Sequence, residues 1–578
     1  MARSTFNAVF ARRVTAEYRD FRTPVTLDEW DDEDVQKQWP PDREDDFFKR
    51  VNNEIWPLDK DDEFWTRPEA IEFDPWEPVP TPSQKAKEQT AWAPVVDFIA
   101  SLVELDDVDF EGKSQIPTTV LRVLNEKDGG PVRLHIYGFS LRSLYQAESN
   151  YHDIDEDEFY LATSPCLSSI RLLVPTHPDR AHGVDDGNRV CFNEDAVARM
   201  IEGLAPNLKF VSFNETYSRR RARHDYIWPG FFPSRPQDTS KRGKGSLETL
   251  ALESGISTDP DSMRAWNDRT SLNFLRSLHL RTWDIDVPTL AVLSEIAEAQ
   301  GLCSLRSLSL WIGGWPSEES EDRISEYRDT EISRFLKALR HLQSLELKGP
   351  FADKTFDTIL HTHRRSLRKL RLIPERDPDV QMEPFVLTRD RVEALVRSCN
   401  QIQDLELRIP RSQGDEDEVR IYHALSELPL LDRLSLLLDC SNLRAAEEES
   451  DNTSGIADSF IREALINLNT SDRALAVDIF DALSLRNSPR LIRLYPDEVG
   501  NFGTDVREWS MIFIRNVLSR AWIRERDDML SHEGGFRITE IEAKNRQNSY
   551  DSNVYFTAID IDAKTYKIQL INYPALTT

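Results

Sequence analysis

The chain carries six copies of a strict Leu-x-x-Leu-x-Leu pattern, which begin at Leu247, Leu275, Leu305, Leu342, Leu367 and Leu431. The last two leucines of each copy are two residues apart, so in a β-strand both point to the same face of the sheet. One buried leucine contributes roughly 1.5–3 kcal/mol, which is too little to offset the conformational entropy of ordering a whole repeat. Several units must therefore stack for any of them to fold, and the pattern predicts a repeat protein.

Allowing other apolar residues at the leucine positions extends the series by five units. These units are Leu105/Val108/Phe110, Leu134/Ile136, Leu167/Ile170/Leu172, Leu208/Val211/Phe213 and Ile402/Leu405/Leu407. The starting points of consecutive units advance by 25 to 41 residues, a spread too wide for a regular array. We therefore expect insertions, and three charged segments are candidates: the acidic residues 152–158 and 413–418 and the basic residues 218–244.

The stretches between the expected strands carry apolar residues at helical spacing. The four clearest faces are Val197/Met200/Ile201/Leu204, Leu290/Leu293/Ile296/Ala297, Ile332/Phe335/Leu336/Leu339 and Val392/Leu395/Val396/Cys399. Pro288 also suits a helix start. Alternating strands and helices predict an α/β fold, an irregular leucine-rich-repeat solenoid with a parallel concave sheet, convex helices and N- and C-terminal extensions.

The turns that follow the strands lack a feature of regular leucine-rich repeats. Regular repeats place Asn or Cys eight residues after the first leucine, where the side chain hydrogen-bonds the turning backbone. Here the corresponding positions hold Pro175, Gly255, Trp283, Gly313, Pro350, Glu375 and Asp439. Other groups must satisfy the backbone in these turns, so we expect irregular curvature.

The sequence divides into three regions. Residues 1–90 are acidic, rich in Trp and Pro and largely without periodicity, residues 91–445 hold the repeats, and residues 446–578 form a linker and an α+β capping region. In the last region, Val506–Ile523 is amphipathic. Two alternating segments, Val554–Ile561 and Tyr566–Ile571, predict a hairpin.

Composition excludes several classes of partner. The net charge of −29 and the isoelectric point near 4.9 argue against nucleic acid or an anionic membrane as the main partner. Five widely spaced cysteines without a C-x-x-C pair indicate a reducing compartment. No apolar run is long enough to span a membrane, and the first twenty residues lack the apolar centre of a secretory signal. We therefore expect a cytoplasmic or nuclear protein.

No catalytic or cofactor-binding motif is visible, and we expect neither an enzyme nor a metal or cofactor site. Asp153, Asp155 and Asp157 imitate the start of a calcium loop, but Glu158 stands where the loop needs Gly. A second weak candidate is the pair His361 and His363, which more simply contacts a helix C-terminus and solvent.

The best candidate site follows from strand geometry. If the leucines face the helices, side chains two, four and six residues after the first leucine of each unit project from the concave face. Basic residues slightly outnumber acidic ones at these positions, which indicates an acidic or phosphorylated protein partner. Trp311 is either an anchor for that partner or packs against an insertion near Trp315. The candidate partner-binding residues are His279, Arg281, Trp311, Lys348, Lys369, Arg371, Arg408 and Arg433.

Several phrases carry a family resemblance. They are Ala91-Trp92-Ala93-Pro94, Gln115-Ile116-Pro117, Arg133-Leu134-His135-Ile136, Phe139-Ser140-Leu141-Arg142-Ser143-Leu144-Tyr145, Trp228-Pro229-Gly230-Phe231-Phe232-Pro233 and residues 476–480. Over roughly residues 92–495, the chain resembles filamentous-fungal F-box and leucine-rich-repeat proteins. The resemblance implies a substrate receptor of a cullin-type ubiquitin ligase, in which an N-terminal F-box binds a Skp-type adaptor and the repeats hold the target.

The chain departs from that family at its N-terminus. An F-box opens with a Leu-Pro-x-Glu phrase and an apolar helix, and residues 1–90 contain nothing similar. The motif is either lost or encoded upstream of Met1, so an adaptor is expected only if an F-box exists. The function expected is a protein-binding scaffold. The alternatives are a structural or assembly scaffold without a ligase role and an enzyme with an unrecognised site.

Overall fold

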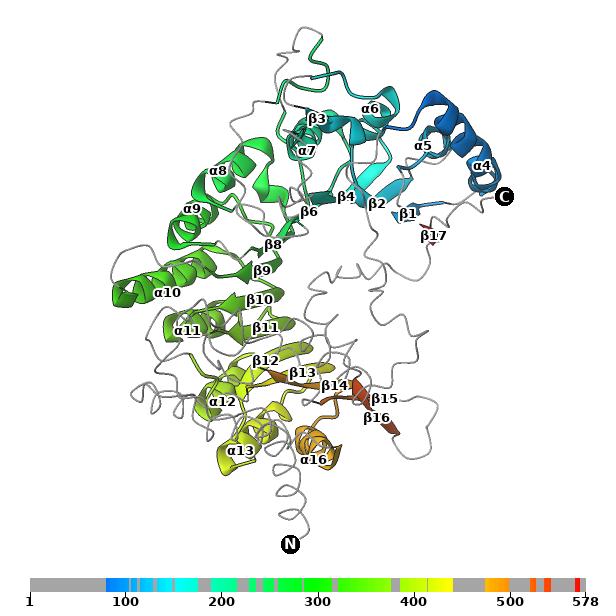
Figure 1. The fold of residues 1–578 in the computed structure, drawn as a ribbon. Helices are drawn as coiled ribbons and strands as arrows, with labels where there is room; N and C mark the ends of the chain where they lie inside the picture. Colours follow the sequence, from blue (N-terminus) through cyan, green and yellow to red (C-terminus); the bar gives the residue numbers. More distant parts are fainter. Residues whose placement is uncertain are drawn as a thin grey trace, which may run out of the picture.

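The computed structural model describes residues 79–497 with gaps, together with residues 520–526, 535–541 and 567–571. The gaps are 103–104, 112–114, 128–131, 148–150, 175–188, 216–227, 235–242, 254–257, 283–284, 314–320, 376–384, 413 and 440–472. The described strands line the inner side of a long arc and the helices line its outer side (Figure 1).

One sheet of fifteen strands runs the length of the arc in the order β16-β15-β14-β13-β12-β11-β10-β9-β8-β7-β6-β4-β2-β1-β17. Pairing is parallel except where β15 and β16 join in antiparallel. The strands are β1 (Asp107–Glu111), β2 (Arg133–Phe139), β4 (Leu167–Val174), β6 (Phe210–Glu215), β7 (Thr249–Glu253), β8 (Ser277–Arg281), β9 (Ser307–Trp311), β10 (Ser344–Gly349), β11 (Lys369–Pro374), β12 (Asp404–Pro410), β13 (Arg433–Asp439), β14 (Leu491–Asp497), β15 (Ala521–Arg526), β16 (Phe536–Ile541) and β17 (Lys567–Ile571). A small antiparallel pair, β3 (Tyr145–Ala147) and β5 (Arg189–Cys191), lies outside this sheet.

Helices connect most neighbouring strands, as parallel pairing requires. They are α4 (Pro82–Ser101), α5 (Thr118–Asn125), α6 (Glu156–Ala162), α7 (Asn193–Arg199), α8 (Pro260–Arg269), α9 (Val287–Glu298), α10 (Glu321–Ala338), α11 (Asp353–Thr362), α12 (Arg389–Ser398), α13 (Glu416–Leu425) and α16 (Arg473–Leu483), with short turns at η3 (Arg142–Leu144), η5 (Met200–Leu204) and η6 (Leu272–Phe274). Local sequence sets several starts. Asp286 caps α9 by accepting from the Thr289 amide, and Pro288 occupies its first turn as predicted.

The leucine triplets stack in register, which confirms their structural role. Leu250 of β7 lies beside Leu278 of β8, which lies beside Leu308 of β9, and this row continues through Leu345 and Leu370 of the next strands. All of them are buried in one hydrophobic core that the helices cover. The alternation of strands and helices predicted from the sequence is thus confirmed as a long, largely parallel α/β repeat.

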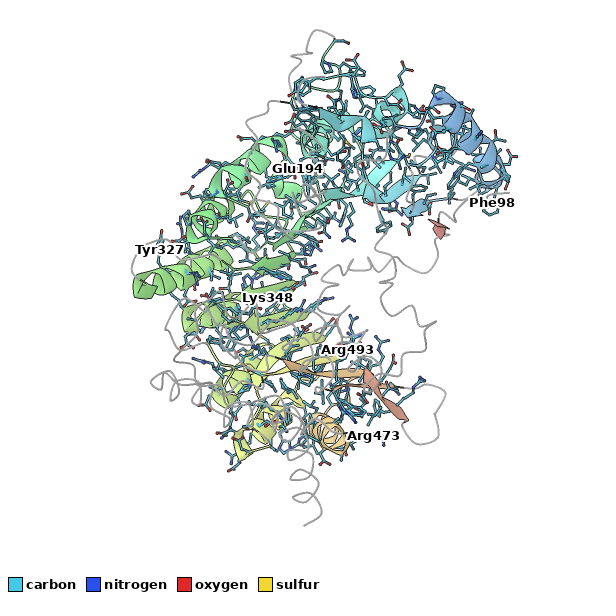
Figure 2. The ribbon with its side chains drawn as sticks, viewed as in Figure 1. Phe98, Glu194, Tyr327, Lys348, Arg473 and Arg493 are labelled. Atoms are coloured by element: carbon cyan, nitrogen blue, oxygen red, sulfur yellow. The ribbon has the colours of Figure 1, made fainter. Side chains whose placement is uncertain are left out.

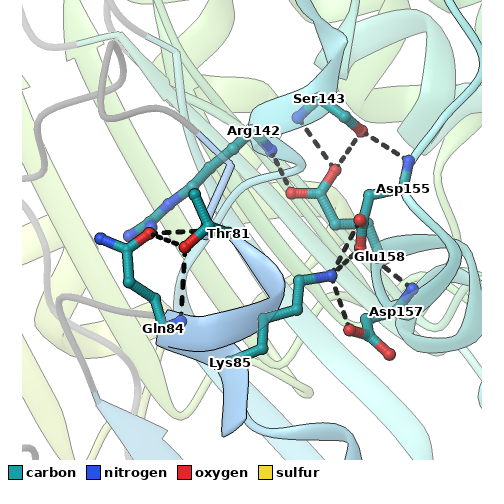
Figure 3. A network of polar contacts seen from close by, with 8 residues as sticks. All are labelled: Thr81, Gln84, Lys85, Arg142, Ser143, Asp155, Asp157 and Glu158. Atoms are coloured by element: carbon teal, nitrogen blue, oxygen red, sulfur yellow. Dashed lines mark hydrogen bonds and ion pairs between the residues drawn. The ribbon is translucent and has the colours of Figure 1, made fainter. Parts of the chain in front are cut away.

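Buried acidic side chains satisfy backbone groups in turns where the expected Asn or Cys is missing. Glu158 accepts from the amides of Arg142 and Ser143 at 2.7 and 3.0 Å and from the Ser143 hydroxyl (Figure 3). Asp329 does the same for three amides at the start of α11. Glu418 accepts from the amides of the loop after β12.

The segment that imitates a calcium loop is held by a cation of the chain itself. The ammonium of Lys85, on α4, lies 2.7 Å from a carboxylate oxygen of Asp155 and 2.7 Å from one of Asp157 (Figure 3). Asp153 instead accepts a hydrogen bond from the Ser234 amide at 3.1 Å. These three carboxylates therefore join α6 to α4 and to the loop at Ser234.

The C-terminal region differs from the expectation in two ways. The sheet continues beyond residue 445, because β14 pairs in parallel with β13 and α16 packs against α13. β17, within the second strand of the expected hairpin, pairs in parallel with β1 at the opposite end of the sheet. Its expected partner, 554–561, lies outside the described residues.

The expectation for His363 was wrong. His363 is fully buried, and its ring lies 3.1 Å from the Leu336 carbonyl and 3.4 Å from the Leu342 amide, so it links α10 to the next strand rather than meeting solvent. Burial lowers the pKa of His363 to about 4, which keeps the ring neutral. His361 is exposed and contacts the Asp357 carbonyl one turn earlier.

Candidate binding site on the concave face of the sheet

The concave face of the sheet is built from the strand positions that alternate with the buried leucines. Because the strands pair in register, residues from distant parts of the chain form rows across this face. One row is Ala251, His279, Ser309, Glu346, Arg371, Glu406, Ser435 and Arg493. Figure 2 shows Lys348 and Arg493 on this inner side, whereas Tyr327 lies on the outer helix α10.

Glu346 on β10 is the centre of a polar network. One of its oxygens accepts from Arg281 and from Ser309, both at 2.8 Å. The other accepts from Arg371 at 2.9 Å and from the indole of Trp311 at 3.2 Å. The side chain of Glu346 is 10% exposed, so three other strands, β8, β9 and β11, bring four donors to one nearly buried carboxylate.

The electrostatics of this network follow from burial and charge. Burial alone opposes ionisation of Glu346, but the positive charges of Arg371 and Arg281 outweigh it and lower the pKa to about 2. For the neighbouring His279, burial together with the Arg281 charge lowers the pKa to about 4. Near neutral pH, Glu346 is therefore a carboxylate and His279 is a neutral ring.

Trp311 lies beneath a cation at the end of β9. The Lys348 ammonium is 4.4 Å from the centroid of the Trp311 ring and 3.3 Å from a carboxylate oxygen of Glu375. Trp311 itself is 4% exposed, so Lys348 and Glu375 stand between its ring and solvent. The alternative packing partner, an insertion near Trp315, lies outside the described residues.

The remaining candidate cations also face carboxylates. Lys369 and Arg433 approach the same carboxylate, Asp404, at 4.0 and 3.3 Å. Arg371 reaches Glu406 at 2.9 Å in addition to Glu346. Thus the modest excess of cations counted along the sequence is largely neutralised within the face.

Arg408 is more deeply buried than the other candidate cations. Its side chain is 5% exposed, donates to the Pro374 carbonyl at 2.9 Å and lies 3.5 Å from Asp439. By contrast, the side chains of Lys369 and Arg433 are about half exposed, at 48% and 53%. The eight candidates therefore separate into buried residues that order the face and exposed residues that are accessible to a partner.

The face extends onto β14 and β15, which the leucine pattern did not predict. Arg493 on β14 lies beside Ser435 of β13 and Ile523 of β15. Its side chain makes no ion pair within the described chain, unlike the candidate cations on β8 to β13. The alternation of Ile492 and Leu494 in front of Tyr495 was the signal for this strand, although no leucine triplet accompanies it.

The arrangement offers polar recognition rather than recognisable chemistry. Within the described residues, no group of three or more His, Cys, Asp or Glu side chains is placed to hold a metal ion. Cys166, Cys303 and Cys399 are free thiols, and burial raises the pKa of Cys399 to about 12. None of the described helices combines the length and the apolar character that a membrane span needs.

Comparison with models of known protein families and with curated protein sequences gives no match for the chain.

Proposed function

We propose that this protein is a non-enzymatic scaffold that binds a protein partner on the concave face of its sheet. The observation that carries the proposal is the network around Glu346, which gathers Arg281, Ser309, Trp311 and Arg371 on the face away from the helices. Ordered side chains at the centre of an extended surface bind with little loss of conformational entropy, which favours recognition.

The exposed side chains suggest how the partner is held. Lys369 and Arg433 share a single carboxylate, and Arg493 has no ion pair in the described chain, so this end of the face keeps unneutralised positive charge. We assign these three residues to contacts with acidic side chains of the partner. Arg281, Trp311 and Arg408 are nearly buried, and we assign them the role of fixing the surface.

The repeats also support a proposed relationship to filamentous-fungal F-box and leucine-rich-repeat proteins. The phrases that carry the resemblance fall on consecutive elements, on α4, before α5 and from β2 through η3. On this view the partner is the target of a cullin-type ubiquitin ligase. Co-purification with a Skp-type adaptor tests the ligase role separately, since a scaffold without that role binds the concave partner alone.

Site-directed photo-crosslinking tests the concave site directly. A photoreactive amino acid is placed at Ser344 or Ser435 on the concave face, and at Arg264 or Lys354 on the outer helices as controls. Irradiation in cells is expected to give discrete adducts from the concave positions and none from the controls. Replacing Lys369, Arg433 and Arg493 by Gln is expected to reduce those adducts.

Adducts from the outer positions alone would move the binding surface elsewhere and contradict the proposal. Absence of adducts from all four positions would also count against it. If the adducts contain only this chain, the second candidate, an assembly scaffold that associates with itself, replaces the first.

A further inference from the structure

A group of arginines occupies the loops that lead from the helices into β9, β10 and β11. These loops are residues 299–306, 339–343 and 363–368, and they contain no Asp or Glu although the chain carries a net charge of −29. We name the group the basic rim, and it consists of Arg306, Arg340, Arg364, Arg365 and Arg368. It lies at the amino ends of the strands, away from the Glu346 network on the concave face.

Backbone hydrogen bonds hold the three loops side by side. The Gln343 amide donates to the Arg306 carbonyl at 2.8 Å, and the Arg368 amide donates to the Gln343 carbonyl at 2.8 Å. Neighbouring strands lie about 4.8 Å apart, so the backbone of the rim spans about 10 Å. The buried Leu305, Leu342 and Leu367 anchor the loops from below.

The five guanidinium groups are available to a partner. All five residues are exposed, and their side chains make no hydrogen bond or ion pair within the part of the chain that the structure describes. Cations near helix C-termini are favourable, but five like charges on three neighbouring loops repel one another. A group of like charges of this kind is not needed for the stability of the fold. It is needed if the loops bind an anion.

The flanks of the rim limit the length of its partner. At the equivalent positions before the neighbouring strands, two ion pairs bound the rim. Glu248 lies 3.4 Å from Arg276 on one side, and Asp432 lies 3.3 Å from Arg490 on the other. A long polyanion that continued along the rim would meet these carboxylates. A stretch of three to five residues, at about 3.3 Å each, matches the positive part.

We propose that the basic rim binds a short segment rich in Asp and Glu on a partner protein. Arginine suits this role because its planar guanidinium group forms paired hydrogen bonds with a carboxylate. Nucleic acid is disfavoured, because its affinity grows with the number of phosphates contacted and the rim is short and bounded by acids. The basic rim lies outside the concave site, so the crosslinking experiment neither supports nor contradicts this role.

Fluorescence anisotropy with the full chain tests the proposal. The probes are a labelled peptide of about ten alternating Glu and Gly residues and a labelled oligothymidine of the same length. The triple variant Arg364→Gln, Arg365→Gln, Arg368→Gln is compared with Arg264→Gln, Lys354→Gln, Arg420→Gln, which removes the same charge from exposed residues of the helices. We expect the rim variant to bind the peptide about tenfold more weakly and the control variant to match the wild type.

Three results would overturn the proposal. An equal loss in both triple variants would show that net charge alone governs binding. Tighter binding of oligothymidine than of the peptide would make the rim a nucleic-acid site. Failure of the wild-type chain to bind the peptide at low salt would leave the rim without the proposed role.

Discussion

Glu346 ionises in a site where little solvent reaches it, because the surrounding donors replace that solvent. Arg281 and Arg371 supply opposite charge, and Ser309 and Trp311 supply neutral hydrogen bonds. A buried ion pair of this kind adds little stability by itself compared with apolar packing, but removing one partner leaves the others uncompensated. Single substitutions at this network therefore have large effects for their size.

Glu346→Gln is expected to destabilise the protein by about 3 kcal/mol, because the nearly buried Arg281 and the partly buried Arg371 lose their shared carboxylate. Urea unfolding followed by tryptophan fluorescence measures the change. The control Glu298→Gln removes an exposed carboxylate paired with Arg334 and is expected to change little. Equal effects of the two substitutions would contradict the central role of Glu346.

The pH dependence of that stabilisation has a definite sign. The pKa of Glu346 is about 2 in the folded chain and near its ordinary value of 4.5 in the unfolded chain. The unfolded state therefore binds more protons between these values, so the contribution is complete above pH 4.5 and is lost as the pH falls toward 2.

Glu158 is expected to show the opposite dependence. Burial raises its pKa to about 7, against the hydrogen bonds from Ser143 and Arg142 that favour the carboxylate. Between these pKa values the folded state binds one proton more than the unfolded state. The contribution of Glu158 to stability is therefore complete below pH 4.5 and is lost as the pH rises through about 7. Between pH 4.5 and pH 8 the wild type is expected to lose on the order of 3 kcal/mol of its free energy of unfolding through Glu158. The Glu158→Gln variant is expected not to show this loss.

Urea midpoints of the Glu158→Gln variant and the wild type, measured across this pH range, check the expectation. The difference between the two proteins isolates Glu158 from the other titrating groups. A difference that stays constant from pH 4.5 to pH 8 would mean that Glu158 titrates alike in the folded and unfolded chains.

At the scale of elements, the turns show how an irregular repeat dispenses with the regular Asn or Cys. Three turns each use a different acid: Glu158 comes from the helix after its turn, Asp329 from the preceding helix, and Glu418 from the first turn of α13. Because each solution is local, the repeats tolerate different lengths. This variety accounts for the spread in repeat spacing seen in the sequence.

Asp329→Ala tests this account of the turns. The substitution removes acceptors for the amides of Ala352, Lys354 and Thr355, and a cost of about 1–3 kcal/mol is expected. Hydrogen exchange should then show faster exchange at the start of α11. Asp357→Ala, an exposed acid on the same helix, is the matched control and is expected to leave exchange unchanged.

The sequence predicted the strands more fully than the surface they build. Leucine triplets encode a buried face, so the eleven units and their order followed from spacing alone. β14 was missed because Ile492 and Leu494 lack the leading leucine. β17 was expected as a strand, but its pairing with β1 joins segments more than four hundred residues apart and could not be predicted from spacing. Concave positions such as Arg371 were identified, but their pairing with Glu346 and Glu406 depends on rotamers that no spacing rule supplies.

At the scale of the whole molecule, one buried core and one sheet join every repeat from β1 to β14. Each added repeat covers the leucines of the one before it, so stability is shared along the arc rather than held in separate globules. The concave face and the basic rim both depend on this register. A slip by one residue would turn every concave side chain into the core.

Cross-linking of paired cysteines tests the register most directly. Ser307 and Ser344 lie opposite each other on β9 and β10, at a strand spacing of about 4.8 Å that suits a disulfide. Ser307→Cys with Ser344→Cys should oxidise readily, whereas Ser307→Cys with Leu345→Cys should not, because Leu345 points to the opposite face. Mass spectrometry of peptides measures both yields. A disulfide in the first pair alone is the predicted result, and equal or reversed yields would contradict the in-register sheet.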